Sequence, residues 1–324
     1  LNFKSKFTSS TNQYCEKLAK KINYKKFDIV EIHNRPLVFN ILHKKINSKF
    51  ILYFHNDPLS MKGSKSIDER LRLLKSVDKI IFVSQWVQER FFTNLDQKLL
   101  NQTEVVYPSI DRSKKLQSKK NQIVFVGKLN PSKGYDIYRD AIIKILNEFS
   151  KWKAFSIGDE SRNKPIIDHP NHHELGYLSH KKVLNFLKKT EIAVVPSRWE
   201  EPFGRTALEA SSRGCATIIS NRGGLPETSD HCLTLKKLDS NNLYNEIKKL
   251  IKNKKLRKIY QKKGFLNVKH ITKDNSRLID EIRANLTSEF KLNFNKNKLR
   301  IVNIYNVGQK LDHRLYNISL GKKF

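Results

Sequence analysis

The chain has 324 residues, with 63 Lys and Arg against 31 Asp and Glu, and a formal net charge of +32 at pH 7. Its length exceeds one typical core and allows two domains of ordinary size. The lysines are spread along the whole chain and no RNA- or DNA-binding motif accompanies them, so nucleic acid is not an expected partner.

The first half of the chain predicts a parallel α/β sheet. The chain opens inside a predicted helix, residues 9–22, and β-rich runs follow at residues 27–36 and 49–64. Alternation of β-rich runs with helices continues through both halves and is typical of such sheets. The apolar part of each run ends at a histidine, His33 or His55. Because the chain begins in a helix, we expect the first strand of this sheet to be missing.

Residues 62–92 mix basic and apolar side chains. The pattern permits two interpretations: a basic amphipathic surface on an anionic membrane, or an ordinary amphipathic helix packed on its own sheet. A membrane contact would suit a lipid-linked acceptor. The side chains concerned are Lys65, Arg70, Arg72, Lys75, Leu71, Leu73, Leu74, Trp86 and Phe91.

Residues 111–121 are polar, rich in Lys and without hydrophobic period, which predicts a hinge between two domains. A β-rich run from Ile123, a turn-rich loop and an amphipathic helix from near Gly134 follow. Lys128 and Lys133 flank this loop, and their ammonium groups can meet one pyrophosphate as point charges. A solvated side chain is the alternative for each Lys.

A ligand-binding loop is predicted further along the chain. The apolar run at residues 192–196 predicts a buried parallel strand, residues 204–213 a helix, and residues 216–220 the next strand. The loop between the first strand and the helix therefore lies at the carboxyl end of a strand. Open α/β sheets bind small molecules at that end.

Glu201 and Glu209 are the candidate ligand groups of this loop and helix. Pro202 biases Glu201 towards an extended conformation outside the helix, while unpaired N–H groups at Phe203 and Gly204 favour an anion. A carboxylate accepts from two donors, so Glu209 can bind the paired hydroxyls of a ribose and Glu201 those of a sugar. Two solvated glutamates on a surface helix are the alternative.

Three ordered motifs resemble the nucleotide-sugar domain of GT-B glycosyltransferases, specifically the retaining family 4 (glycosyltransferase group 1). They are VGKLNPSKG at 126–134, PSRWEEPFGRTALEA at 196–210 and GCATIISNRGGLPE at 214–227. The resemblance implies an α/β fold of two Rossmann-like, doubly wound domains that face a cleft. The implied domains are an acceptor-side domain at 1–113, a donor-binding domain with a C-terminal crossover helix at 114–286, and a linker with the start of a further α/β module at 287–324.

The resemblance also implies roles for the matching residues. His55, Glu201 and Lys133 would be the catalytic residues, with His55 facing the donor sugar from the first domain. His33 is either structural or in contact with the acceptor. The residues implied to bind a nucleotide-sugar donor are Lys128 and Lys133 for the diphosphate, Glu209 for the ribose, Glu201 for the transferred sugar, and Phe203 and Gly204 through their backbone.

The implied reaction moves a sugar to a hydroxyl of a saccharide or lipid-linked acceptor with retention of configuration, in cell-envelope polysaccharide or lipopolysaccharide synthesis. The chain offers no serine or cysteine arrangement for covalent catalysis. A polar cluster around Pro170 fits no standard zinc spacing, so we expect neither a metal nor another cofactor. The cluster consists of Asp168, His169, His172, His173 and Glu174.

Two alternatives to this transferase remain open. The expected absence of a first strand motivates a catalytically disabled, transferase-like binding module in a larger chain. Another GT-B activity, such as a phosphorylase or an epimerase, is the second. At the other end of the chain, residues 300–305 predict a strand, which indicates either a further α/β module or a C-terminal tail.

The predicted location is the cytoplasm. No apolar run has the length of a membrane span. Cys15, Cys215 and Cys232 are widely spaced and form no paired motif, which is typical of reduced thiols in a cytosol. Peripheral contact with the inner face of the cytoplasmic membrane is a further option.

Overall fold

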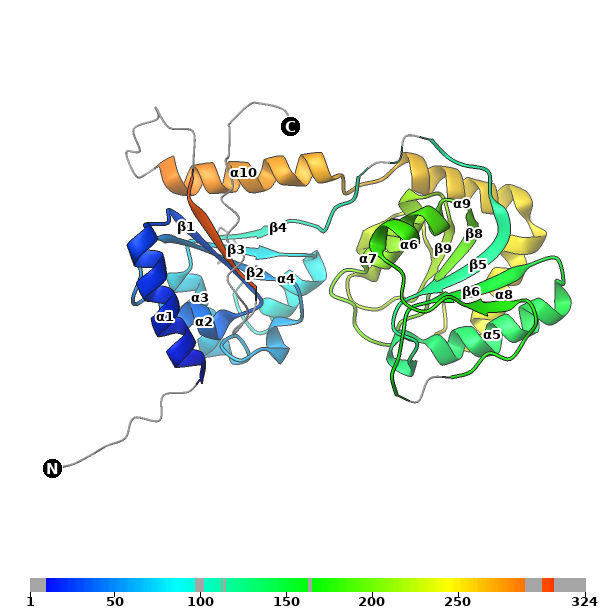
Figure 1. Cartoon of the computed structure of the whole chain (residues 1–324), viewed down its shortest axis with the longest axis horizontal. Helices are drawn as coiled ribbons and strands as arrows, with labels where there is room; N and C mark the ends of the chain where they lie inside the picture. The colour runs from blue at the N-terminus through cyan, green and yellow to red at the C-terminus, as the bar shows by residue number, and fades with distance from the viewer. Residues whose placement is uncertain are drawn as a thin grey trace. The chain divides into compact units, whose positions relative to one another are not determined.

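The computed structural model describes residues 10–96, 102–111, 113, 115–162, 165–288 and 299–305. The chain divides into two compact units (Figure 1). Unit 1 consists of Leu1–Tyr107 and Ser276–Phe324, and unit 2 of Pro108–Asn275. Each unit is built around one parallel sheet.

Unit 1 contains a parallel sheet in the order β11-β1-β2-β3-β4. Its strands are β1 (Ile29–His33), β2 (Lys49–Phe54), β3 (Lys79–Phe82), β4 (Thr103–Val105) and β11 (Ile301–Ile304). Its helices are α1 (Ser10–Lys25), α2 (Pro36–Leu42), the 3₁₀ turn η1 (Pro58–Ser60), α3 (Ile67–Ser76), α4 (Gln85–Phe91) and α10 (Thr272–Ser288), the last of which begins in unit 2.

Helices cover both faces of this sheet. Alternate side chains of a strand point to opposite faces. Val30 and Ile32 of β1 pack in a core with side chains of α1, α2, α3 and α4, whereas Ile29 packs with Ile282 of α10 on the other face. Figure 1 shows α10 across one face and the other helices across the opposite one. Burial on both faces explains why β2 and β3, after their first residue, are apolar without polar alternation.

Unit 2 contains a six-stranded parallel sheet in the order β10-β9-β8-β5-β6-β7. Its strands are β5 (Lys120–Val126), β6 (Lys153–Ile157), β7 (His172–Glu174), β8 (Thr190–Val195), β9 (Ala216–Ile219) and β10 (Leu233–Thr234). Its helices are the 3₁₀ turn η3 (Pro131–Lys133), α5 (Tyr135–Glu148), α6 (His180–Leu187), α7 (Arg205–Ser212), the 3₁₀ turn η4 (Leu225–Thr228), α8 (Ser240–Lys252) and α9 (Lys254–Leu266).

The sheet of unit 2 is also covered on both faces. Ile123 and Phe125 of β5 pack with α5 and α8, while Val124 packs with Val183 of α6 and Ala210 of α7. The prediction of two Rossmann-like α/β domains is therefore confirmed, including the strands and the helix around residues 192–220.

The strand expected at residues 300–305 forms at Ile301–Ile304, and it joins the sheet of unit 1. Ile301 pairs with Ile29 in parallel, and the Arg300 N–H donates to Asp28 Oδ2 over 2.7 Å. Ile301 and Ile304 are buried, so both faces of this short strand extend existing cores. The rest of the predicted module, residues 306–324, lies outside the described residues.

The division of the chain also differs from the expected boundaries at residues 113/114 and 286/287. The first part of unit 1 ends at Tyr107, two residues after the end of β4 at Val105, and unit 2 begins at Pro108. The second crossing lies within α10, at Ser276, since most of this helix packs on the sheet of unit 1.

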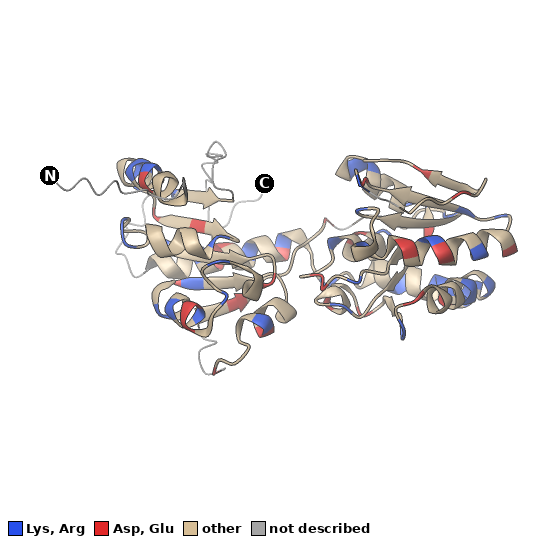
Figure 2. Ribbon diagram, turned by 90° about the horizontal axis from the view of Figure 1, so that it is seen from below, with Lys and Arg blue, Asp and Glu red and all other residues tan. Residues whose placement is uncertain are grey.

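The apolar side chains within residues 62–92 lie in the core of unit 1. Leu73, Leu74 and Phe91 are buried, and buried Arg70 donates to the backbone oxygens of Lys65 and Thr93, each over 2.8 Å. These contacts favour a helix packed on its own sheet. Peripheral membrane contact stays a prediction. Within the described residues, no helix combines the length and apolarity that a membrane crossing needs. Lys and Arg occur on elements of both units and not on one alone (Figure 2).

A buried ion pair joins α10 to the middle of the sheet in unit 1. Arg283 donates from Nε and Nη2 to the two carboxylate oxygens of Glu31, over 2.7 and 2.9 Å. The Tyr53 hydroxyl donates to the same carboxylate over 3.3 Å. Glu31 is only 1% exposed, so the pair replaces water as the partner of both charges.

We expect Glu31→Ala to lower the free energy of unfolding by about 3 kcal/mol, because it removes the carboxylate that Arg283 holds through two hydrogen bonds and leaves the guanidinium its pair with Asp280. Glu281→Ala is the matched control, since Glu281 lies on the same helix in an exposed pair with Arg277, and such pairs contribute about 0–1 kcal/mol. Urea unfolding of both variants measures the difference. Equal losses would show that α10 does not depend on the buried pair.

Candidate functional site

The loop after β5 positions Lys133 at the carboxyl edge of the unit 2 sheet. Asn130 caps the 3₁₀ turn η3, since its side chain accepts from the Lys133 N–H over 3.2 Å. Its Nδ2 also donates to Glu160 Oε2 over 2.8 Å, which ties the loop to the segment after β6. Lys128 lies earlier in the same loop with an exposed side chain. Both predicted lysines are thus on one loop.

The loop after β8 packs directly against this turn. The N–H groups of Arg198 and Trp199 both donate to the backbone oxygen of Ser132 over 3.0 Å. The backbones approach closely because Gly134 has no side chain and adopts φ +74°; a methyl group there would lie 1.9 Å from the carbonyl oxygen of Pro196. The two loops are therefore joined at their closest point.

This packing brings Lys133 and Glu201 together. Lys133 Nζ lies 2.6 Å from Glu201 Oε1, and the ammonium group also lies 4.1 Å from the centre of the Trp199 ring. The Gly224 N–H donates to the backbone oxygen of Glu201 over 2.6 Å, which holds the Glu201 loop against the turn after β9. A cation and a carboxylate from two loops thus meet at one point of the sheet edge.

Phe203 and Gly204 lie at the start of α7, as predicted. Gly204 is the N-cap residue, with φ +108°, and a methyl group there would lie 2.4 Å from Leu225 Cδ2. The side chain of Phe203 is buried and meets the His270 ring edge-on at 5.4 Å between ring centres. Phe203 therefore fixes the entrance of the helix, and only its backbone can serve a ligand.

Glu209 lies within α7 and is 8% exposed. Its Oε1 is 2.9 Å from His180 Nε2 and 3.5 Å from Arg205 Nη2. A ring nitrogen of His180 and the guanidinium of Arg205 thus face the Glu209 carboxylate. Two neighbouring hydroxyls of a ligand could take the same places. Sequence reasoning missed His180, since no motif relates the first residue of α6 to α7.

In unit 1, His33 and His55 meet at the carboxyl ends of β1 and β2. His33 Nδ1 lies 2.9 Å from His55 Nε2, and His33 Nε2 lies 3.0 Å from Asn303 Oδ1. The His33 ring is stacked on Tyr53 at 4.3 Å and on Tyr305 at 4.1 Å. Sequence reasoning identified both histidines but missed Asn303, which carries no local signal.

Both histidines are neutral at pH 7. Burial lowers the pKa of His33 to about 4, against the hydrogen bond to Asn303, which raises it. Burial also lowers the pKa of His55 to about 4, and the neighbouring His33 acts in the same direction. Each ring therefore carries one N–H and one lone pair.

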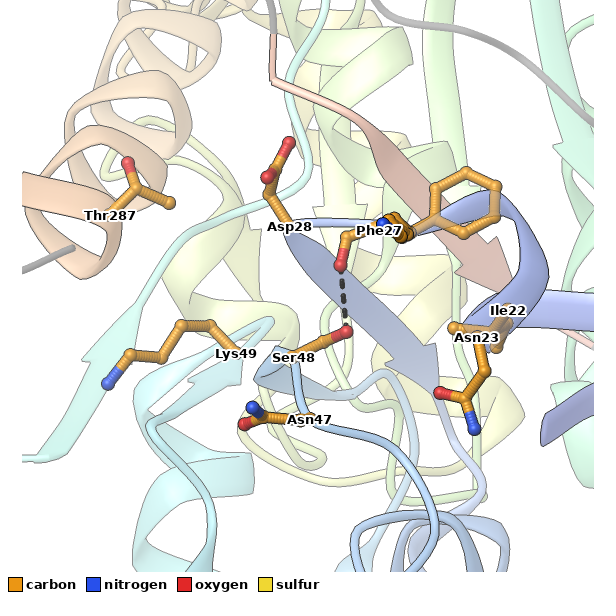
Figure 3. A pocket seen from close by; sticks show the side chains of 9 residues that line it. Ile22, Asn23, Phe27, Asp28, Asn47, Ser48, Lys49 and Thr287 are labelled. Carbon is orange, nitrogen blue, oxygen red and sulfur yellow. Dashed lines mark hydrogen bonds between the residues drawn. The ribbon is translucent and has the colours of Figure 1, made fainter. Parts of the chain in front are cut away.

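A separate pocket of about 300 Å³ lies in unit 1 at the amino ends of β1 and β2. Figure 3 shows its lining residues, among them Asp28 before β1 and Lys49 at the start of β2. Ser48 donates to the backbone oxygen of Phe27 over 2.8 Å at its wall. The pocket contains none of the predicted site residues, which lie at the opposite, carboxyl edges of the sheets.

Within the part of the chain that the structure describes, no group of three or more His, Cys, Asp and Glu side chains could hold a metal ion. From the cluster around Pro170, His172 lies in β7 with its Nε2 2.9 Å from Ser156 Oγ. Burial lowers the pKa of His172 to about 4. The expectation of a metal-free reaction stays a prediction.

Comparison with known proteins finds a family match that covers most of unit 2. Residues 107–266 match the family described as Glycosyl transferases group 1. The chain is 27% identical over 281 residues to the putative glycosyltransferase YtcC of Bacillus subtilis, covering 74% of this chain and 66% of that protein. It is 29% identical over 244 residues to an uncharacterized 41.2 kDa protein in the cps region of Klebsiella pneumoniae, covering 67% of this chain and 66% of that protein. The chain thus spans about two thirds of these relatives.

The fold is also found in solved structures. Anabaena Alr3699/HepE in complex with UDP and glucose superimposes with a TM-score of 0.68 at 16% identity, covering 83% of this chain and 80% of that chain. At this identity the likeness shows the fold: two Rossmann-like domains, each with a parallel sheet, as in GT-B glycosyltransferase structures.

We expect Gly134→Ala to destabilise the chain more than Gly176→Ala. Both glycines have positive φ, +74° and +62°, but a methyl group at Gly176 meets nothing within 4 Å. Gly176→Ala should cost about 1–2 kcal/mol from backbone strain alone, and Gly134→Ala should cost clearly more because the two loops must separate. Urea unfolding compares them. Equal decreases in the free energy of unfolding would show that the backbone at Pro196 can move away from residue 134 without a loss of stability.

Proposed function

We propose that the chain, whose residues 107–266 match the family described as Glycosyl transferases group 1, transfers a sugar from a nucleotide-sugar donor to a hydroxyl of a saccharide or lipid-linked acceptor. The configuration of the sugar is retained. The chemistry of the carboxyl edge of unit 2 supports this proposal, and so do the ligands of structural relatives.

The meeting of Lys133 and Glu201 at 2.6 Å carries the proposal. A ligand that contacts both must present an anionic group directly beside hydroxyl groups, because the ammonium binds anions and the carboxylate accepts from hydroxyls. A sugar diphosphate has this arrangement at the bond that is broken. In the free protein the two side chains neutralise each other, and the donor replaces this pair with its own charges and hydroxyls.

The remaining side chains of the edge fit the other parts of a nucleotide-sugar. Glu209 accepts from the ribose hydroxyls in place of His180, and Lys128 adds a second cation for the diphosphate. Backbone N–H groups at Phe203 and Gly204 face the entrance of α7, where the helix dipole favours an anion. The presence of UDP and glucose in the Anabaena relative supports a donor of this class.

The proposed reaction needs no protein nucleophile. The acceptor hydroxyl attacks the anomeric carbon on the face from which the diphosphate leaves; the new oxygen–carbon bond forms as the carbon–oxygen bond to phosphate breaks. The hydroxyl proton passes to an oxygen of the leaving diphosphate. Lys133 and Lys128 stabilise the negative charge that develops there, while Glu201 and His55 orient the sugar.

The cysteines fit this assignment. Burial raises the pKa of the Cys215 thiol to about 11 and that of Cys232 to about 12. A buried protonated thiol is a poor nucleophile. Covalent catalysis through these residues is thus disfavoured.

We assign the product to polysaccharide synthesis at the cell envelope. The relative in the cps region of Klebsiella pneumoniae supports this pathway. Cytoplasmic nucleotide-sugar is the expected donor pool, and an acceptor at the membrane would require only a peripheral contact. Lipopolysaccharide is a second product of the same class.

Glu209→Ala and Glu201→Ala should separate the two parts of the donor. We expect Glu209→Ala to weaken binding of both UDP and UDP-glucose about tenfold, since hydrogen bonds to a charged group contribute about 1.5–3 kcal/mol. Glu201→Ala should leave UDP binding unchanged and weaken UDP-glucose by a similar factor. Calorimetric titration of each variant measures both affinities.

Asp140→Ala is the control, because Asp140 is an exposed carboxylate on α5 that pairs with Arg139. It should bind both ligands like the parent chain. GDP and ADP titrated in parallel identify the base. The donor site would be wrongly assigned if all three variants bound each nucleotide and nucleotide-sugar as tightly as the parent chain does. It would also be wrongly assigned if the folded parent chain bound none of them.

A further inference from the structure

The hydrogen bonds around His33 also determine which of its two ring nitrogens carries the proton. Asn303 Oδ1 can only accept, so the 3.0 Å contact requires that His33 Nε2 carries the proton. Because His33 is neutral, its Nδ1 then holds a lone pair and must be the acceptor in the 2.9 Å contact with His55 Nε2. Tautomers follow from such networks when hydrogens are not seen.

The tautomer of His33 determines the tautomer of His55. If its Nε2 donates to His33, its proton is on Nε2 and its Nδ1 holds the lone pair. Within the described residues no side chain or backbone group is a hydrogen-bond partner of that Nδ1. Among the described residues, the fully buried side-chain nitrogen and oxygen atoms without a hydrogen-bond partner are Arg70 Nε and Arg213 Nε. His55 Nδ1 is not one of them, so it is not fully buried. His55 Nδ1 is thus an acceptor without a hydrogen-bond partner among the described residues, on a side chain that is half-buried.

The surrounding fold holds this arrangement in place. His33 is paired in register with Tyr53 on β2, and Asn303 with Glu31 on β1. The rings of Tyr53 and Tyr305 stack on that of His33 with interplanar angles of 11° and 16°. The backbone N–H of His55 donates to Asn34 Oδ1 over 2.6 Å. Three adjacent strands therefore fix the two imidazoles.

We propose that Asn303 and His33 are positioning residues, which hold His55 in its Nε2–H tautomer so that His55 Nδ1 accepts a hydrogen bond from a hydroxyl of the transferred sugar. This inference rests on the proposed function of His55 at the donor sugar. It gives β11, and Asn303 in particular, a part in sugar binding that neither its sequence nor its distance along the chain from His55 suggests.

The tautomers can be read directly. Histidine-selective ¹⁵N labelling and long-range ¹H–¹⁵N correlation at about pH 7.5, where a histidine of ordinary pKa is also neutral, distinguish protonated from bare ring nitrogens. His33→Gln and His55→Gln assign the signals. We expect both rings of the parent chain to be single Nε2–H tautomers. In Asn303→Ala both rings should become mixtures of the two tautomers. Asn303→Asp keeps an acceptor oxygen at this position, so both rings should remain single Nε2–H tautomers.

Tyr305→Leu is the matched control, because it removes a stacked ring next to Asn303 and leaves the hydrogen bonds in place. It should not change the tautomers. A parent chain in which His55 carries its proton on Nδ1, or an Asn303→Ala variant whose imidazole signals equal those of the parent, would overturn the inference.

Binding gives the second readout. UDP-glucose should shift the signal of His55 Nδ1, whereas UDP should not. Asn303→Ala should weaken UDP-glucose about fivefold, the worth of one hydrogen bond, with UDP unchanged. Tight UDP-glucose binding that leaves His55 Nδ1 unshifted would overturn the inference and leave the donor site intact. If the chain bound no nucleotide, the proposed function would be contradicted. The spectra of the ligand-free chain would still show which tautomer His33 and His55 adopt.

Discussion

The close contact between two loops at the carboxyl edge of the unit 2 sheet is the constraint on which the candidate site depends. Gly134 allows its loop to reach the carbonyl of Pro196, and Ser132 then accepts from two successive N–H groups of the partner loop. Backbone contacts of this kind are rigid, so the side chains on either side of them are held at fixed positions. Lys133 and Glu201 meet because their backbones meet first.

Unit 1 uses a different device at its own sheet edge. Polar side chains lie in register on adjacent parallel strands, with Glu31 and His33 on β1 and Asn303 on β11. Each has a partner: Arg283 for the carboxylate and Asn303 for the imidazole. Buried polar groups that are fully paired specify one arrangement, because any alternative leaves a group unsatisfied. The same face therefore supports both α10 and the two histidines.

Much of this arrangement could be predicted from local sequence. The apolar run before Pro196, the helix after Gly204 and the strand at Ala216 form as their patterns indicate, because a buried parallel strand and an amphipathic helix each carry their own signature. The pairing of residues 301–304 with β1 was not predicted. A strand's sequence encodes its own burial but not which sheet it joins, and β11 pairs with a strand more than 250 residues earlier, Ile301 with Ile29.

The sequence by itself determined the fold class, the two-domain organisation and the residue types at the donor edge, since periodicity and motif spacing are local properties. The tertiary structure alone decided which side chains meet. His180 faces Glu209, Trp199 lies over Lys133, and Asn303 reaches His33. These contacts arise where separate strands end at one edge of a sheet, and their partners are set by strand order and register, which no local pattern records.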